Sequence, residues 1–286
     1  MMQPHKVNCW MVLRYTLLVL FAGTMVVPFV WMVTTSLKPR IEAEQPYLVP
    51  HKPQPQNYAI VLRRAPDPVT GKKLDLDYPK WYLNSLFIAL WVTTLQVFTS
   101  AMAAYAFSRI QWKWRDRVFL LYLATMMIPG LVLMIPNYQI MVKLHLVNTY
   151  TGLILPSAFS AFGTFLLRQF MLTIPPSLDE SAAMDGASHA RIFLDIILPL
   201  ARPGVVTLAI FTFLGNYHSF FWPLVMIKDD WLRTLPVGML SFQTTYGRQT
   251  ELLMAATVMC IVPLIIFFVV MQKQLVAGIQ MGAVKE

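Results

Sequence analysis

Six long stretches of this chain contain no lysine, arginine, aspartate or glutamate. These stretches are residues 15–37, 81–108, 118–142, 144–167, 203–227 and 252–272. A helix needs about 20 apolar residues to cross a hydrocarbon layer about 30 Å thick, so each stretch is long enough to span a membrane. Only 13% of the residues are charged, against about 25% in a typical soluble domain. The sequence therefore predicts an all-α membrane protein with six transmembrane helices.

Other classes of protein fit the same sequence poorly. Cys9 and Cys260 are the only cysteines, which excludes a disulfide scaffold. The first apolar stretch is longer than the apolar region of a signal peptide, which has about 7–15 residues, so we expect it to remain as a helix. The net charge of +9 gives no case for nucleic-acid binding, because the basic residues are scattered.

The charge-free stretches also divide the chain into parts. We predict an N-terminal tail, a first span, a periplasmic loop, a five-helix core and a C-terminal tail, with bounds 1–14, 15–37, 38–80, 81–272 and 273–286. The periplasmic loop contains eight prolines, which predicts an extended backbone. Outside that loop, the short loops on the side of the two termini hold seven Lys and Arg residues, and those on the opposite side hold four. This asymmetry favours a cytoplasmic location for both termini.

The loop at residues 172–202 has the pattern of two short helices joined by a turn. Ser177 and Glu180 have the spacing of a capping box at the start of the first helix. Gly186 is placed to end that helix in a left-handed turn, and Ser188 can cap the second helix. The second helix carries an apolar face and is closed by prolines; these residues are Ile192, Phe193, Ile196, Ile197, Pro199 and Pro203. Such an element either rests on lipid headgroups or docks a partner protein.

The spacing within this loop matches a known pattern. Glu180-Ser181-Ala182, three residues, Gly186, nine residues and then Ile196-Ile197-Leu198-Pro199 follow E-A-A-x-x-x-G-x(9)-I-x-L-P, with Ser181 in place of the first alanine. The loop thus resembles the EAA loop of ABC importer permeases. Further segments resemble the MalG-like carbohydrate permeases of this family: 35–39, 84–85, 104–109, 148–156, 221–224 and 282–285. Residues 63–78 are the weakest match in that resemblance and look like an insertion of unknown role in the first loop.

The resemblance implies a type I importer with the MetI-like permease fold, in the bacterial cytoplasmic (inner) membrane. The implied partners are a second homologous permease forming a heterodimer, two ATPase subunits, a periplasmic or lipid-anchored solute-binding protein, and membrane lipid. The chain would then be a transport subunit and not an enzyme. It would bind no cofactor, since ATP and Mg would lie on the ATPase. The implied coupling residues are Glu180, Ser181, Ala182, Asp185, Gly186, Ile196, Leu198 and Pro199.

Polar side chains within the apolar stretches are candidates for the solute path, because such groups usually face a cavity or another helix. The candidates are Tyr138, Asn216, Tyr217, His218 and Ser219, with Asn137 beside the first. The alternative is that they form hydrogen bonds to the partner permease. The five histidines are scattered, and no metal-binding motif is present in the sequence. The resemblance suggests a carbohydrate, polyol or glycerol-phosphate solute; a secondary transporter or a permease for a non-sugar solute is the alternative.

Overall fold

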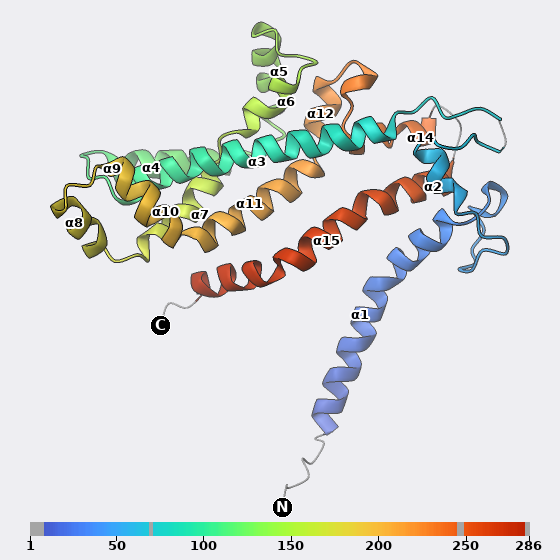
Figure 1. Cartoon of the computed structure of the whole chain (residues 1–286), viewed down its shortest axis with the longest axis horizontal. Helices are drawn as coiled ribbons and strands as arrows, with labels where there is room; N and C mark the ends of the chain where they lie inside the picture. Colours follow the sequence, from blue (N-terminus) through green and yellow to red (C-terminus); the bar gives the residue numbers. More distant parts are fainter. Residues whose placement is uncertain (1–8, 69–70, 245–248, 284–286) are drawn as a thin grey trace, which may run out of the picture. The chain divides into compact units, whose positions relative to one another are not determined.

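The computed structural model describes residues 9–68, 71–244 and 249–283, and all regular structure within these ranges is helical. The all-α prediction is therefore confirmed for the described chain. The helices form two compact units (Figure 1). Unit 1 comprises Met1–Tyr78 and Met239–Val262, and unit 2 comprises Pro79–Gly238 and Pro263–Glu286.

Three helices are long and apolar enough to cross a membrane without interruption. They are α1 (Cys9–Ser36), α3 (Tyr78–Ser108) and α15 (Thr250–Ala283), and their apolar parts coincide with the first, second and sixth charge-free stretches. The most apolar segment of α1 is not buried against any other part of the described chain. A helix that is apolar all round and unburied is suited to contact lipid or a neighbouring subunit.

The first loop contains more helix than its prolines suggested. After the short 3-10 helix η1 (Arg40–Glu42), the chain forms α2 (Gln56–Val61), which begins directly after Pro55. Proline is compatible with a helix start because its φ angle is already helical and its missing N–H needs no partner there. The expectation of a wholly extended loop was therefore wrong at α2.

Two side chains fix this loop to the end of α1 within unit 1. Asn57, on α2, donates hydrogen bonds from Nδ2 to the carbonyl oxygens of Ser36 and Lys38 at 2.9 and 3.0 Å. The ammonium of Lys38 is fully buried and donates to the carbonyl of Gln45 at 3.0 Å. It also lies 4.6 Å and 4.7 Å from the ring centres of a tryptophan and a tyrosine. These contacts give the loop a defined conformation next to the membrane helix.

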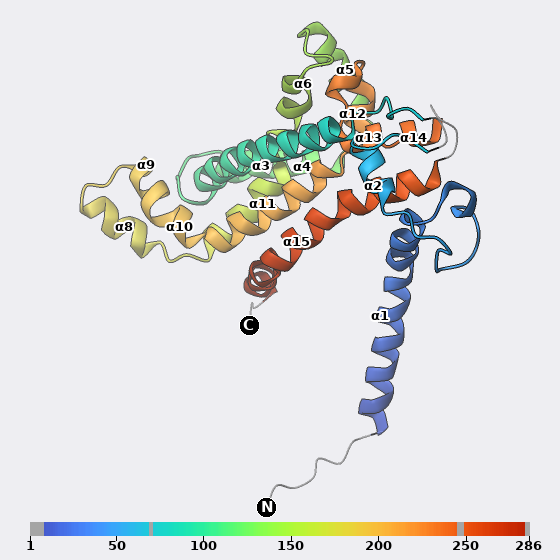
Figure 2. The same ribbon diagram turned by 45° about the vertical axis from the view of Figure 1, so that its right-hand side comes forward.

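In unit 2, α3 packs beside three shorter helices (Figure 2). These are α4 (Arg115–Ala124), α7 (Ala161–Leu172) and α11 (Arg202–Tyr217). Gly163 on α7 permits a close approach, since a Cβ at this position would lie 2.6 Å from Ser100 Oγ on α3. Gly204 on α11 does the same towards Phe170 at 2.5 Å. The small residues thus set how closely these helices pack.

The third charge-free stretch is not one continuous helix, as the prediction of an uninterrupted span had supposed. Helix α4 passes into a 3-10 turn, η2 (Thr125–Met127), and helix α5 (Met134–Lys143) starts only after an irregular segment. The break begins at Ile128, which has extended φ and ψ angles of −84° and 118°. Pro129 follows Ile128, and a residue before proline is driven out of the helical region by steric contact with the proline ring. Each resulting helix has 10 residues.

The fourth and fifth stretches lie in bent helix pairs. Helix α6 (Tyr150–Ile154) and the 3-10 turn η3 (Leu155–Ser157) meet α7 at 44°. The helical segment His189–Leu200 meets α11 at 77°. Counting each pair as one span gives up to five candidate spans in the described residues.

The end of unit 2 that carries α5, α6 and α12 (Phe221–Met226) is held by polar side chains (Figure 1). Asn84 donates to the carbonyl oxygens of Trp231 and Arg233, at 2.9 Å each, and accepts a hydrogen bond from the Tyr150 hydroxyl at 2.7 Å. Asn148 accepts from two backbone amides at 228 and 229. These contacts position η5 (Asp230–Leu232) and α13 (Leu235–Gly238) against α3. The remaining short helix, α14 (Ser241–Thr244), belongs to unit 1.

Candidate functional site

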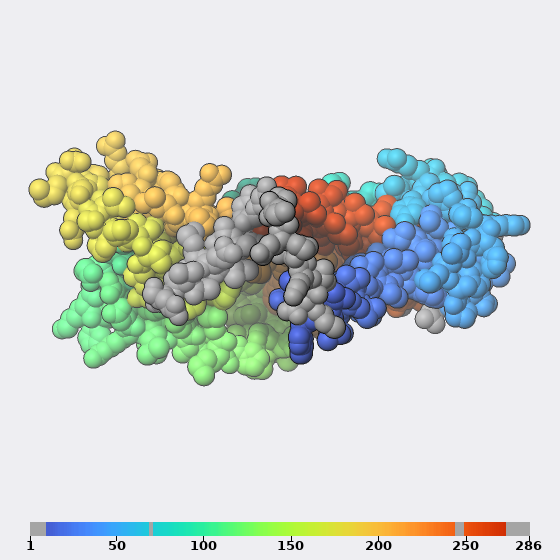
Figure 3. All heavy atoms as spheres, turned by 90° about the horizontal axis from the view of Figure 1, so that it is seen from below, coloured from blue at the N-terminus to red at the C-terminus, as the bar shows by residue number. Residues whose placement is uncertain are grey.

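The 172–202 loop lies at one end of unit 2, where Figure 3 shows it in yellow to gold. Its first arm is α8 (Ser177–Met184), and its second arm consists of α9 (His189–Arg191), the π-helix η4 (Ile192–Ile197) and α10 (Leu198–Leu200). Gly186 between the arms has a φ angle of +81°, in the left-handed region. Ser188 caps the second arm, since its hydroxyl accepts a hydrogen bond from the Arg191 amide at 3.4 Å. Both of these local predictions are confirmed.

The predicted capping box at the start of α8 was wrong. The N-cap is Pro176, whose φ and ψ angles of −62° and −25° are already helical, so Ser177 falls inside the first turn. The Ser177 carbonyl instead accepts a hydrogen bond from the Ser181 hydroxyl at 2.8 Å. No side-chain cap is formed, and the Glu180 side chain remains exposed to solvent. The reading in which Glu180 serves only to cap its own helix is therefore excluded.

The end of the second arm also differs from the expectation. Pro199 does not close it, because α10 continues to Leu200 and the bend follows at Ala201. Pro199 lies in the first turn of the short α10, where the missing N–H of proline is tolerated. Pro203 occupies the corresponding position at the start of α11. The two prolines therefore begin helical segments instead of ending them.

The inner face of the loop packs into an apolar cluster with α3, α7 and α11. From the loop, Ile192, Phe193 and Ile197 are buried, and they meet Tyr105 and Leu167 among others. Ile196 and Leu198 pack against the same cluster from its edge, as does Ala182 on α8. The loop is thus attached to the membrane helices by a continuous apolar contact.

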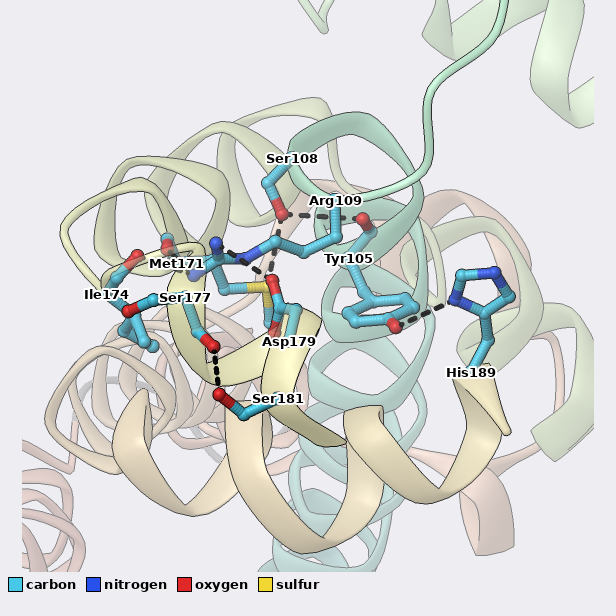
Figure 4. Close-up of polar contacts among 9 residues, drawn as sticks. All are labelled: Tyr105, Ser108, Arg109, Met171, Ile174, Ser177, Asp179, Ser181 and His189. Carbon is cyan, nitrogen blue, oxygen red and sulfur yellow. Dashed lines mark hydrogen bonds and ion pairs between the residues drawn. The ribbon is translucent and has the colours of Figure 1, made fainter. Parts of the chain in front are cut away.

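A buried ion pair joins the loop to the end of α3 (Figure 4). The side chain of Arg109 is only 7% exposed. Nη1 of its guanidinium lies 3.0 Å from Oδ2 of Asp179 on α8. Its Nη2 donates to the carbonyl oxygens of Met171 and Ile174 at 2.7 and 2.8 Å. These carbonyls lie at the C-terminal end of α7 and just after it, where the negative end of the helix dipole attracts a cation. One side chain therefore contacts α7 and α8 from the end of α3.

A second polar contact joins the same two elements. The Tyr105 hydroxyl on α3 lies 3.3 Å from Nδ1 of His189, at the start of the second arm (Figure 4). The Tyr105 ring also packs on Phe193, with ring centres 5.2 Å apart. Both arms of the loop thus contact the last turns of α3.

Neighbouring charges order the short segment between α3 and α4. Asp116 accepts a hydrogen bond from Arg115 at 3.1 Å and lies 3.6 Å from Nη2 of Arg168 on α7. The pKa of the Asp116 carboxyl is lowered below its ordinary value, and the hydrogen bond from Arg115 is the largest cause. Burial opposes this shift, and the charges of Arg115 and Arg168 add to it. Arg168 also donates to the carbonyl of Phe107 at 3.1 Å. This network lies on the same side of the unit as the loop.

The outer face of α8 presents a compact set of exposed groups. Glu180, Ser181, Asp185 and Gly186 are all exposed, and Met184 retains 89% of its surface. Within the described residues, neither Glu180 nor Asp185 forms an ion pair, and a Cβ at Gly186 would meet nothing within 4 Å. The face therefore combines unpaired acids, an exposed methionine and a position without a side chain.

The candidate residues for the solute path lie in two separate regions of the fold. Asn216 donates to the Thr212 carbonyl at 2.8 Å within α11, and Tyr217 is buried with 1% of its surface exposed. His218 is exposed at the end of α11, and Ser219 is half-buried. Tyr138, on α5, packs at the edge of a separate apolar cluster. The fold therefore groups positions 216–219 but does not bring Tyr138 into that group.

A shallow groove of about 380 Å³ runs along α11. It is lined mainly by apolar side chains, including Phe162 and Phe211, together with three polar ones. Of these, Gln96 on α3 donates to the Thr212 hydroxyl at 3.0 Å, and Asn216 lies one turn further along. The sequence reasoning identified Asn216 but missed Gln96. Gln96 gave the same kind of signal, since it is a polar side chain within the second charge-free stretch.

Comparison with known proteins identifies the family of this chain. Residues 96–280 match the family described as "Binding-protein-dependent transport system inner membrane component". The chain belongs to this family. It is 34% identical to the trehalose/maltose transport system permease protein MalG of Thermococcus litoralis, over 96% of this chain and 98% of that one. It is 39% identical to the arabinooligosaccharides transport system permease protein AraQ of Halalkalibacterium halodurans, over 73% and 75% of the two chains.

The fold agrees with this assignment. The permease matches a chain in the crystal structure of a bacterial ABC transporter involved in the import of the acidic polysaccharide alginate, with a TM-score of 0.80. The match covers 96% of this chain and 99% of the other at 23% identity, and it therefore speaks to the fold alone. The permease is a multi-pass inner-membrane transport subunit and not an enzyme. It works with an ATPase and a solute-binding protein, which decides against a secondary transporter working alone.

The contact between Arg109 and Asp179 was missed by the sequence reasoning. Both residues lie in segments that were singled out there, Arg109 at the end of the second charge-free stretch and Asp179 beside Glu180. A lone charge at the end of a membrane helix was the signal available for Arg109. The pairing itself joins positions 70 residues apart, and no local periodicity relates them.

Proposed function

We propose that this permease forms half of the translocation path of an importer for a carbohydrate or a related polyol or glycerol-phosphate solute. The observation that carries the proposal is the similarity to a trehalose/maltose permease along 96% of the chain. Relatives with different solutes in their names include AraQ, for arabinooligosaccharides, so the sugar itself is not assigned. A permease for a non-sugar solute is the competing possibility.

The 172–202 loop is, in this proposal, the coupling element that docks into the ATPase from the cytoplasm. The exposed face of α8 supports this role, since Glu180 and Asp185 are unpaired in the described structure and can meet basic groups of a partner. Gly186 leaves the backbone open to close approach. Ile196 and Leu198 brace the loop on the membrane helices, whereas Pro199 is exposed. With the loop in the cytoplasm and the six spans expected from the sequence, both termini lie there too.

The assembly proposed for transport has two permeases, two ATPases and one external solute-binding protein. The second permease is homologous and completes the path as a heterodimer. ATP and Mg bind to the ATPase subunits, and this chain binds neither. ATP binding would close the ATPase dimer, move the docked loops and shift the permeases from an inward-facing to an outward-facing state. A ligand shifts such an equilibrium only through different affinities for the two states, so the loop must stay docked in both.

Residues near positions 216–219 supply the solute contacts in this proposal. Asn216 and Gln96 offer amide groups beside the aromatic rings of Phe162 and Phe211, a combination that suits a sugar. The competing role for these side chains is hydrogen bonding to the partner permease. Tyr217 is buried in this chain and can act on the solute only through its neighbours.

The docking role is tested by substituting Gly186 with asparagine and measuring how much ATPase co-purifies. Asparagine tolerates a positive φ, so Gly186→Asn adds side-chain bulk with little backbone strain. We expect co-purified ATPase to fall about tenfold, which corresponds to about 1.4 kcal/mol of binding free energy. Gly71→Asn is the matched control, because Gly71 also has a positive φ, of +66°, and nothing within 4 Å of its Cβ position. Unchanged ATPase binding in Gly186→Asn and in Glu180→Gln would refute the docking role.

The solute class is tested with the binding protein that co-purifies with the complex. Titration calorimetry against maltose, trehalose, arabino-oligosaccharides, a polyol, glycerol 3-phosphate and an amino acid would measure its preference. Uptake of the preferred solute by proteoliposomes containing the whole complex and ATP would then be measured. Binding of the amino acid alone, or ATP-independent uptake, would overturn the proposal.

A further inference from the structure

Arg109, directly after α3, contacts both the end of α7 and the start of α8 (Figure 4). It follows directly after the last residue of α3, and its guanidinium is nearly buried. It forms an ion pair with Asp179 at 3.0 Å and donates two hydrogen bonds to carbonyl oxygens, at 2.7 and 2.8 Å. Charge-assisted hydrogen bonds of this length are the strong ones in proteins.

The geometry requires an arginine in particular. The acceptors lie on two different elements, and the planar guanidinium presents several N–H groups in a fixed fork that can reach both at once. A lysine ammonium is a point charge on a flexible stem and cannot reproduce this fork. In addition, removing one partner of a buried ion pair leaves the other charge without compensation. The contact is therefore specific in shape and strongly held.

The other ion pair of the loop provides a contrast. Arg191 and Asp195 lie 3.4 Å apart, but both belong to the second arm and both side chains are more than half exposed. Among the ion pairs of the described residues, the pair of Arg109 with Asp179 is the one that joins this loop to the end of a membrane-spanning helix. Its partner, Asp179, lies one residue before Glu180, on the helix whose outer face is exposed.

We propose that Arg109 is a positioning residue that transmits the displacement of α8 to α3. The inference rests on the proposed coupling function of the 172–202 loop. When the ATPase moves the docked α8, the rigid contact through Asp179 carries the end of α3 with it, and the 31-residue helix moves as one body. Without the guanidinium, α8 remains attached through the apolar cluster and, by way of the second arm, through the contact of His189 with Tyr105. Its motion is then only partly passed to α3. Arg109 contacts neither solute nor nucleotide.

The test measures the distance between α8 and α3 by double electron–electron resonance in the whole importer. Spin labels are placed at Leu178→Cys on α8 and at Leu90→Cys on α3, both exposed positions, in a chain with Cys9→Ser and Cys260→Ala. Residue 90 lies 19 positions before Arg109, about 28 Å along a helix, which suits this method. Distances are recorded without nucleotide and after trapping with ATP and vanadate.

We expect the mean distance to be the same in both states for the labelled parent. In Arg109→Gln and Asp179→Asn, we expect it to change on trapping by at least about 2 Å, the scale of helix shifts in such transitions. Arg109→Lys keeps the charge without the fork, and we expect an intermediate change. Arg191→Gln is the matched control, since it removes an ion pair inside the loop, and its distances should equal those of the parent.

Three results would overturn the inference. The first is an unchanged distance in Arg109→Gln and Arg109→Lys after trapping with the ATPase still bound. The second is a distance already altered in these variants without nucleotide, because Arg109 then only shapes the resting fold. The third is absence of the ATPase from the labelled parent complex, which refutes the proposed coupling function itself and is recognised before any variant is made.

Discussion

Replacing Asn84 should destabilise unit 2 by more than the loss of one hydrogen bond, because its side chain forms three. The Asn84 amide is 2% exposed, donates to the carbonyls of Trp231 and Arg233, and accepts from the Tyr150 hydroxyl. Asn84→Leu has a similar volume but leaves these three groups without their partner. A buried polar group left unpaired costs about 1–3 kcal/mol, so we expect a loss of about 3–9 kcal/mol for the three. A melting temperature shifts by about 2 °C per kcal/mol in a chain of this size, which gives about 6–18 °C.

The measurement is the melting temperature of the purified complex in nanodiscs, within a double-mutant cycle. Tyr150→Phe removes one of the three hydrogen bonds and should lower the melting temperature by about 2–4 °C. The double variant should be less destabilised than the sum of the two single variants, because both remove the same hydrogen bond. Thr94→Val on α3 is the control; its exposed hydroxyl bonds only to a carbonyl of its own helix, and its shift should stay below about 1 °C.

Two outcomes would refute this reasoning. A shift of less than about 2 °C for Asn84→Leu would mean that the three groups find other partners or water. Full additivity in the cycle would mean that the hydrogen bond between Tyr150 and Asn84 does not contribute to stability. In either case, contacts other than those of Asn84 would have to hold the 228–235 segment in place.

Three further changes test other parts of the fold. Gly152→Ala should destabilise the permease by about 1–3 kcal/mol, measured as a lower melting temperature, because the new Cβ would lie 2.1 Å from the Leu146 carbonyl oxygen. Lys38→Met should speed protease cleavage of the first loop several-fold, because the buried ammonium loses its carbonyl and ring contacts. The difference in melting temperature between the parent and Asp116→Asn should be constant from pH 5.5 to 8. The lowered pKa keeps this carboxylate ionised there, and its contribution is lost only as the pH falls below about 4, through the folded-state pKa.

Some structural features followed from short-range signals in the sequence. Gly186 was expected to adopt a left-handed conformation and does, because only glycine does so at little cost. Ser188 caps the second arm as expected, since capping depends on groups within three residues. The break of the third stretch at Pro129 had the same kind of signal, because the residue before a proline avoids the helical region. The charge-free length of the stretch outweighed that signal in our prediction.

The errors came from competition between local rules. Ser177 and Glu180 have the spacing of a capping box, but Pro176 already has helical backbone angles, which starts the helix one residue earlier. The first loop contains eight prolines, yet Pro55 starts a helix because its ring favours the helical φ. In both cases a proline acted at a helix start, where its constraints agree with helix geometry.

The sequence by itself determined the membrane class, the helical content and the family, because these depend on composition, on uncharged length and on fixed spacing. The tertiary structure alone decided that Arg109 meets Asp179, that Asn84 meets Tyr150 and that the groove joins Gln96 to α11. The physical reason is distance along the chain. Helical periodicity relates residues within a few turns, whereas these partners are 66 to 116 residues apart and meet only when whole helices pack.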